Sequence, residues 1–379
     1  MLFSLLLAGA SVVSAAACRG KGKGKGKGNC DAESFTNLVA FGDSYTDNGR
    51  LVHYIVNSGS APTAGQLHAE SNVTASGGLT WVQYAAREAE ATLYDYAVSG
   101  ATCSNNIVAR DAAFIGREFP SVLEDEIPSF TADVAFNALY PTRTAANTVY
   151  ALWIGTNDLG FDAFLSDSQA PGKTITDFVG CVWSVFDAIY QTGGRRFVLL
   201  NTAPLELTPL YAKPENGGTY DSQFWGTKTQ YNITEYGAKI KQYSTNVNTI
   251  FSYGVPVEAS IKSRWPGATV DLFDVHSLFL DIIKTPQEFL DAPYNVTGYF
   301  RHCQATDNSN CVDQTALGPR SGFLWYDELH PTDKAGKLSS YCVKLANVAD
   351  EEIADSVIAN HFLDVVAGNS KYGARFTSG

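Results

Sequence analysis

FGDSYTD, residues Phe41 to Asp47, follows directly on the apolar run that begins at Asn37. A short apolar run of this kind predicts a buried strand, which places Ser44 on the sharp turn that leaves the strand. A turn in this position can present a serine hydroxyl at the end of a sheet. Ser44 is therefore a candidate nucleophile, although Asp43 and Ser44 would serve equally well as helix N-caps.

Two later motifs supply the other groups that a serine nucleophile needs. GTNDLG spans Gly155 to Gly160, and DELHP spans Asp327 to Pro331. Asn157 offers a side-chain amide that can bind an oxyanion, and the second motif offers a histidine base with a carboxylate to orient it. A nucleophile, an oxyanion donor and an oriented base are the parts of acyl transfer by a serine enzyme.

His330 is the candidate base and Asp327 its orienting carboxylate. The neutral hydroxyl of Ser44 is a weak nucleophile and needs a base within hydrogen-bond reach. A spacing of three residues puts Asp327 and His330 on the same side of a helical turn, and Pro331 favours a loop at the histidine followed by a helix start. The alternative is an ordinary surface pair at a helix N-terminus, and His302 is the second candidate base.

Gly100 is a second candidate for the oxyanion site. It follows the run YDYAVS, and a glycine there would allow a ligand to approach its N–H closely. An ordinary turn glycine is the alternative, just as Asn157 could form an Asx-turn. Asp158 is expected to order the loop rather than to catalyse.

Apolar runs alternate with helical patterns along the chain. The predicted strands are 38–41, 93–98, 148–154, 197–201 and 269–273, and the predicted helices are 80–91, 177–191, 234–252 and 332–348. This alternation predicts an α/β fold, with a five-stranded parallel sheet covered by helices on both faces. Sites in such sheets form at the carboxyl ends of strands, where Ser44, Gly100 and Asn157 all fall. Insertions at 204–229 and 285–320 are expected to wall the cleft.

Composition excludes several classes of partner. The chain has 379 residues, a net charge of −12 and 45% hydrophobic residues, enough for a large core. An acidic surface without a basic stripe argues against nucleic acid and anionic membranes. The spacing of cysteines and histidines predicts no zinc site, no Gly-Lys-Ser/Thr phosphate loop occurs, and no pair of acids stands out as that of a glycosidase.

The amino-terminal segment indicates secretion. Residues 1–17 have an apolar stretch ending in small residues, as in a cleaved signal peptide, and are too short for a membrane span of about 20 residues. Residues 18–32 carry a Gly/Lys repeat and are expected to be a disordered tether. Residues 33–379 are then expected to form a single domain of an extracellular protein, a monomer.

Cysteines and sequons fit an extracellular chain. Of seven cysteines, Cys303 and Cys311 bracket a polar loop and are the best candidates for a disulfide. The odd count leaves at least one cysteine free or paired with another chain. Sequons at Asn72, Asn232 and Asn295 are expected to carry N-glycans on exposed loops.

In their order, these motifs resemble the blocks of the SGNH or GDSL hydrolase superfamily. The matching blocks are FGDS with Ser44, the glycine block at Gly100, GTND with Asn157, and DxxH with Asp327 and His330. More narrowly, the chain is similar to secreted fungal acetylesterases of carbohydrate esterase family sixteen, through GLTWVQY (78–84), YDYAVSGATCSN (94–105), LWIGTNDLG (152–160), NTAPLELTPLY (201–211) and WYDELHPT (325–332). It departs from many relatives in having GDSY where they have GDSL, and the Gly/Lys tether is not a family feature.

The resemblance implies a mechanism and roles for these residues. Ser44 would attack an ester carbonyl while His330, oriented by Asp327, takes its proton. The N–H groups of Ser44 and Gly100 and the amide of Asn157 would bind the oxyanion, and water would then hydrolyse the acyl-enzyme. No metal or cofactor takes part in this scheme.

The resemblance also implies a fold and a substrate class. The fold would be a three-layer α/β/α, flavodoxin-like one, and the substrates short acyl esters, often acetyl groups on hemicellulose sugars. Trp81, Asp158 and Trp325 are expected to contact the substrate. Two alternatives stay open: a lipase or phospholipase with the same triad acting on longer acyl esters, and a non-catalytic cell-wall protein that binds sugars.

Overall fold

A six-stranded sheet forms the centre of the structure, a computed structural model that describes residues 34–303, 310–333 and 356–379. The order across the sheet is β12, β7, β6, β5, β1 and β2. The strand bounds are β1 (Asn37–Gly42), β2 (Thr92–Asp95), β5 (Thr148–Trp153), β6 (Arg196–Leu200), β7 (Thr269–Phe273) and β12 (Gly373–Thr377). The five predicted strands are present and parallel to one another, which confirms the parallel sheet.

The expectation of five strands misses β12, which pairs antiparallel with β7 at the edge of the sheet. The residues of β12 are exposed or half-buried, so its sequence GARFT contains no apolar run. Arg375 lies opposite Asp271 of β7, and its guanidinium donates to both carboxylate oxygens at 2.7 and 2.9 Å. This ion pair helps to hold an edge strand that the sequence does not reveal, because the strand has no apolar run.

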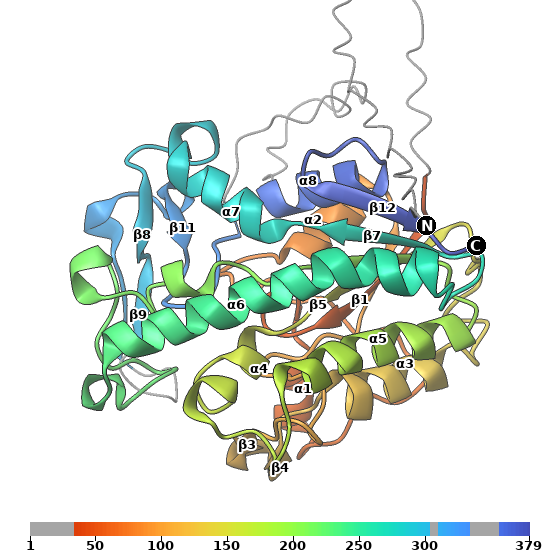
Figure 1. The fold of residues 1–379 in the computed structure, drawn as a ribbon, viewed down its shortest axis with the longest axis horizontal. Helices are drawn as coiled ribbons and strands as arrows, with labels where there is room; N and C mark the ends of the chain where they lie inside the picture. Colours follow the sequence, from red (N-terminus) through yellow and green to blue (C-terminus); the bar gives the residue numbers. More distant parts are fainter. Residues whose placement is uncertain (1–33, 304–309, 334–355) are drawn as a thin grey trace, which may run out of the picture. The chain divides into compact units, whose positions relative to one another are not determined.

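Helices cover both faces of the sheet, so the predicted three layers are confirmed (Figure 1). Helices α2 (Trp81–Glu88) and α8 (Val357–Val366) pack on each other over one face. Helices α3 (Ile127–Asp133), α5 (Ile175–Gln191) and α6 (Ile233–Pro256) form the layer on the other face. The remaining helices are α1 (Arg50–Val56), α4 (Thr156–Leu159) and α7 (Val275–Lys284).

Polar caps begin the helices that the sequence predicted. Before α2, the N–H of Thr80 donates to the Gln83 side chain at 2.9 Å, completing a capping box. Thr174 and Asp177 form the same motif before α5. Asn232 caps α6 by accepting from the next turn. The predicted helix 332–348 lies almost wholly outside the described residues.

The two insertions, 204–229 and 285–320, contain short helical turns and small strands. The strands in and beside the second insertion are β8 (Asn295–Tyr299), β9 (Arg301–Cys303), β10 (Cys311–Asp313) and β11 (Phe323–Trp325), and the small ribbon elsewhere is β3 (Asp111–Ala112) with β4 (Arg117–Glu118). The insertions meet where the N–H of Gln223 donates to Cys303 O at 3.2 Å.

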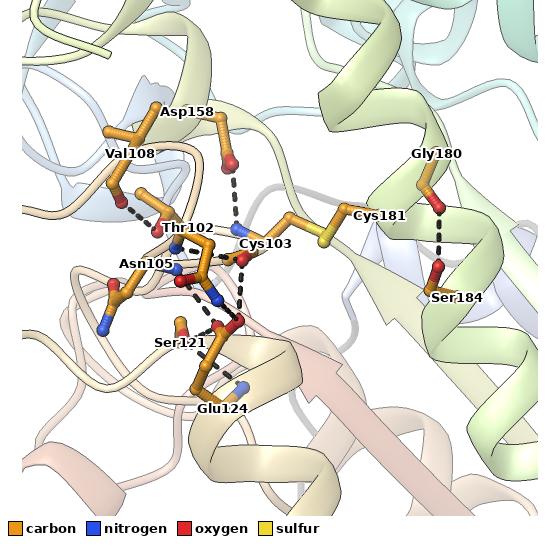
Figure 2. The surroundings of a disulfide bond; sticks show 12 residues. Thr102, Cys103, Asn105, Val108, Ser121, Glu124, Asp158, Gly180, Cys181 and Ser184 are labelled. Carbon is orange, nitrogen blue, oxygen red and sulfur yellow. Dashed lines mark hydrogen bonds between the residues drawn. A yellow bond between two sulfur atoms is a disulfide. The ribbon is translucent and has the colours of Figure 1, made fainter. Parts of the chain in front are cut away.

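Two disulfides lie within the described residues. Cys303–Cys311 closes the ribbon of β9 and β10, as the sequence predicted. Cys103–Cys181, which the sequence left open, ties the loop after β2 to helix α5 (Figure 2). Cys18, Cys30 and Cys342 lie outside the described residues, as do the predicted signal peptide and tether.

Within the three described segments, no helix is both long enough and apolar enough to cross a membrane.

The two disulfides should contribute unequally to stability. Cys103 and Cys181 are 78 residues apart and Cys303 and Cys311 only 8. Chain entropy then predicts that replacing the first pair by serines lowers the free energy of unfolding by about 4.5 kcal/mol, and replacing the second pair by about 2.5 kcal/mol. Urea unfolding of the two double variants beside the parent measures both losses. Equal losses, or a larger loss at the ribbon, would contradict this ranking.

Candidate active site

The turn that carries Ser44 begins at a position that only glycine can occupy. Gly42 ends β1 with φ +146°, and a Cβ there would lie 2.2 Å from the carbonyl oxygen of Trp153 in β5. The chain then folds back, because Asp43 O accepts from Thr46 N at 3.0 Å and Asp47 N at 2.9 Å. Ser44 therefore lies just past the carboxyl end of the buried strand β1, where the sequence predicted it.

Ser44, His330 and Asp327 form a continuous chain of hydrogen bonds. Ser44 Oγ lies 2.7 Å from His330 Nε2, and His330 Nδ1 lies 2.8 and 2.9 Å from the two carboxylate oxygens of Asp327. The three residues are buried, with exposed fractions of 4 to 6%. The carboxylate is itself fixed, since Asp327 Oδ1 also accepts from the backbone N–H groups of Leu329 and His330.

The DELHP segment is a tight loop, as Pro331 predicted, and Asp327 and His330 do not lie on a helical turn. Tyr326 N donates to His330 O at 2.7 Å, and Trp325 and Pro331 form an isolated bridge that closes the loop. The side chain next to the nucleophile anchors this loop, because Tyr45 Oη donates to Leu329 O at 2.9 Å. The loop and the Ser44 turn are therefore held together by a second contact.

The surroundings of His330 favour its protonated form. Burial lowers the pKa of the imidazole, but the charge and hydrogen bond of Asp327, with smaller contributions from Asp43 and Glu328, outweigh it and raise the pKa above its ordinary 6.5. The rings of Tyr45 and Phe224 meet the imidazole edge-on, with centroids at 5.6 and 5.3 Å. These contacts fix the plane of the ring.

Ser44 follows β1 and Gly100 lies beyond the neighbouring strand β2, and each residue offers a backbone N–H group. Among the residues that the structure describes, neither N–H has a protein acceptor. Gly100 has φ +88°, and a Cβ on it would lie 2.4 Å from the ring of Phe119, so glycine is required here too. The segment is pinned by Asp47, which accepts from both the N–H and the hydroxyl of Ser99 at 2.7 Å.

Asn157 lies in the one-turn helix α4, directly after β5. Its Nδ2 donates to Ala101 O at 2.8 Å, which uses one of the two amide hydrogens. Its Oδ1 accepts from Arg110 at 2.8 Å. Sequence reasoning missed Arg110, because it stands in a loop outside the four motifs and meets Asn157 only through the fold.

Buried carboxyl groups hold the loops of this sheet edge by accepting from backbone N–H groups. Glu126 accepts from Gly42 N and Val98 N, and Asp95 from Asn48 N and Ala97 N. Burial raises the pKa of Glu126 and of Asp95 well above the ordinary value. Sequence reasoning also missed these two acids, since isolated acidic residues carry no local signal.

Three residues expected to contact the substrate lie in the core instead. Trp81 is 4% exposed, and Asp158 and Trp325 are fully buried. Trp81 Nε1 donates to Thr46 Oγ1, and Trp325 Nε1 donates to Val296 O. Asp158 accepts from Cys103 N, and Figure 2 shows this hydrogen bond. Burial raises the pKa of Asp158 to about 7. Asp158 therefore orders the loop, the role that the GTND motif alone suggested.

The second candidate base and the sequon asparagines all lie within the described residues. His302, the second candidate base, is hydrogen-bonded to the buried Glu328. Asn72 and Asn232 are exposed, whereas Asn295 is half-buried and accepts from Gly298 N. Over the described ranges, no group of three His, Cys, Asp or Glu side chains is placed to hold a metal ion.

This geometry can carry out acyl transfer. His330 can take the proton of Ser44 as the hydroxyl attacks a carbonyl carbon, and Asp327 can stabilise the imidazolium that forms. The N–H groups of Ser44 and Gly100, which have no acceptor in the part of the chain that the structure describes, and the second amide hydrogen of Asn157 can bind the oxygen that becomes negative.

Comparison with known proteins shows the family to which the chain belongs. The sequence profile of the GDSL-like lipase/acylhydrolase family matches residues 38–342, which include Ser44 and His330. The chain belongs to the GDSL-like lipase/acylhydrolase family. It is 49% identical to an acetylesterase of Hypocrea jecorina over 90% of this chain and 91% of that one. It is 33% identical to an acetylesterase of Thermothelomyces thermophilus over 49% of this chain and 60% of that one.

Among solved structures, an acetylxylan esterase of Geobacillus stearothermophilus matches 68% of this chain and 84% of its own. The identity is 14% and the TM-score 0.29, a likeness too weak to add to the family assignment.

The raised pKa of His330 predicts the pH dependence of this family member. His330 must be neutral to accept a proton, so kcat/KM on a soluble aryl ester should fall as the pH drops through a midpoint above 6.5. Burial raises the pKa of Asp43 to about 6, so its carboxylate is charged in that range. Asp43→Asn removes this charge but keeps an oxygen for Tyr45 N, and should move the midpoint to lower pH.

Glu258→Gln is the matched control, because this carboxyl pairs with Lys262 and Arg264 and is not among the charges that act on His330. Its replacement should leave the midpoint of the profile unchanged. A profile that does not move with Asp43→Asn, or that moves equally with both variants, would contradict the electrostatic account of His330.

Proposed function

We propose that this protein is a secreted serine esterase that hydrolyses short acyl esters, acetyl esters above all, on hemicellulose-derived sugars. The observation that carries the proposal is the 2.7 Å hydrogen bond between Ser44 Oγ and His330 Nε2, continued to Asp327. The acetylesterase of Hypocrea jecorina, aligned over nine-tenths of both chains, supports the acetyl preference.

In the acylation step, Ser44 Oγ forms a bond to the ester carbonyl carbon and its proton passes to His330 Nε2. Asp327 keeps the other ring nitrogen protonated and stabilises the imidazolium. The negative oxygen of the tetrahedral intermediate is held by the N–H groups of Ser44 and Gly100 and by Asn157 Nδ2. The intermediate then collapses, and His330 gives the proton to the leaving alcohol.

In the deacylation step, a water molecule attacks the acyl-enzyme while His330 again takes a proton. The same donors hold the second oxyanion, and Ser44 recovers its proton as acetate leaves. Each oxyanion donor typically lowers the barrier by about 3 to 4 kcal/mol. The whole cycle uses side chains and backbone of this chain and water.

The substrate class is supported by the walls around His330. Phe224 of the first insertion meets the imidazole, and Leu210 N of the same insertion donates to Glu328 O. Both insertions are rich in Tyr, Asn, Asp, Gly and Thr. Polar groups interleaved with aromatic rings suit a hydrated sugar better than a long acyl chain.

Extracellular location belongs to the same proposal. The two disulfides within the described residues fit an oxidising compartment. We propose residues 1–17 as a cleaved signal peptide, 18–32 as a tether and 33–379 as one catalytic domain that acts as a monomer. The exposed Asn72 and Asn232 are the better-placed glycan acceptors, and Asn295 the less accessible one.

Loss of the nucleophile or the base should abolish hydrolysis. Ser44→Ala and His330→Ala are each expected to lower kcat on an aryl acetate by at least about 10⁴-fold, because triad members act as a unit. Asp327→Asn should be severe but less complete. Steady-state kinetics on folded variants, checked by circular dichroism, measure the effect.

His302→Ala is the control for this series, because His302 bonds to Glu328 and not to Ser44. It should keep most of the activity. Near-parental turnover by Ser44→Ala, or a larger loss with His302→Ala than with His330→Ala, would refute the proposed mechanism.

Acyl length separates the acetylesterase from the lipase alternative. We expect kcat/KM to be highest for acetyl esters and to fall toward octanoyl, with acetylated xylo-oligosaccharides as competent substrates. An apolar tunnel would add about 0.8 kcal/mol of binding for each buried methylene, so a lipase should show the opposite trend. Specificity constants that rise from acetyl to octanoyl would favour the lipase.

A further inference from the structure

Arg110 joins two parts of the proposed oxyanion site. The residue lies in the loop just before β3, and its Nη1 donates to Gly100 O at 3.0 Å and to Asn157 Oδ1 at 2.8 Å. Its guanidinium carbon stands 5.3 Å from the centre of the Phe119 ring, the ring that covers Gly100. The guanidinium of Arg110 thus contacts both Gly100 and the side-chain amide of Asn157.

Arg110 selects one of the two orientations of the Asn157 amide. A guanidinium carries only hydrogen-bond donors, so it binds the amide oxygen and disfavours the amide nitrogen. In the selected orientation one hydrogen of Nδ2 goes to Ala101 O at 2.8 Å, and the other is left for a ligand. The flipped amide would set nitrogen against Arg110 and oxygen against Ala101 O, which leaves buried polar groups unpaired.

The same guanidinium completes the support of the loop that carries the Gly100 N–H. Asp47 holds Ser99, Arg110 holds Gly100 O, and Asn157 holds Ala101 O. Three consecutive residues are therefore each fixed by a side chain. A charged donor also polarises the amide that it binds, which makes the remaining N–H of Asn157 a better donor.

We propose that Arg110 is a positioning residue for the hydrolysis, which sets the Asn157 amide and the Gly100 loop in the geometry that binds the oxyanion. It acts through these two groups and does not itself hold the ester. The inference rests on the proposed function, because it assumes that the oxyanion forms against Gly100 and Asn157.

Arg110→Gln tests the role directly. A 1 Å misplacement can cost about 100-fold in rate, and complete loss of an oxyanion donor costs about 100- to 1000-fold. A donor that is only partly misplaced should therefore lower kcat on an aryl acetate by about 10- to 100-fold. The oxyanion forms only in the transition state, so binding of the substrate in its ground state should be little affected. KM should therefore change by less than about threefold.

A double-mutant cycle with Asn157→Ala separates positioning from general damage. If Arg110 acts through Asn157, adding Arg110→Gln to Asn157→Ala should lower kcat much less than Arg110→Gln does alone. Arg143→Gln is the matched control, since Arg143 also donates to a backbone carbonyl, Thr192 O, at 2.7 Å and stands over the ring of Phe130 at 5.7 Å. It should lower the melting temperature and leave kcat unchanged.

Ser44→Ala in the same assay keeps this inference distinguishable from the proposed function. An active Ser44→Ala enzyme sinks the proposed function, and the positioning role falls with it. An inactive Ser44→Ala enzyme together with parental kcat in Arg110→Gln, or with losses that simply multiply in the cycle, overturns the role of Arg110 alone. Should Arg110→Gln fail to fold, Arg110→Met, which keeps much of the aliphatic stem and removes every donor, enters the same cycle, where the same two results support or overturn the role.

Discussion

The parallel pairing of β1 between β5 and β2 is the constraint on which the rest of the structure depends. Parallel strands end at the same edge of a sheet, so the loops after these three strands are neighbours. Ser44 follows β1, Gly100 lies beyond β2, and Asn157 lies beyond β5. The approach is so close that residue 42 opposite Trp153 has no room for a side chain. The DELHP loop then needs only to bring His330 to Ser44.

The buried acids at this edge explain how irregular loops are held so tightly. Backbone N–H groups that leave a sheet must find acceptors, and Glu126, Asp95, Asp47 and Asp158 supply them with side chains. Burial of these groups raises the pKa of Glu126, Asp95 and Asp158, so holding the loops comes at an electrostatic cost. Within the described ranges the N–H groups of Ser44 and Gly100 have no such acceptor, and the proposed mechanism uses them.

Much of this site could be predicted from the sequence because its parts are local. The turn around Ser44, the GTND helix start and the DxxH loop each combine a functional side chain with the residues that shape its backbone. Arg110 could not be found in that way, because its partners are ten and forty-seven residues away along the chain. Strand β12 was missed because an edge strand needs no apolar run. Trp81 and Trp325 were misplaced because a tryptophan that stacks on a sugar and one that fills a core look the same in sequence.

The most direct test of the account is to trap its covalent intermediate. Enzyme quenched in acid during turnover of an aryl acetate should carry one acetyl group, and peptide mass spectrometry should place that group on Ser44. Ser44→Ala, treated in the same way, should carry none. An acetyl group on another residue, or equal labelling of the Ser44→Ala protein, would contradict the claim that Ser44 is the nucleophile.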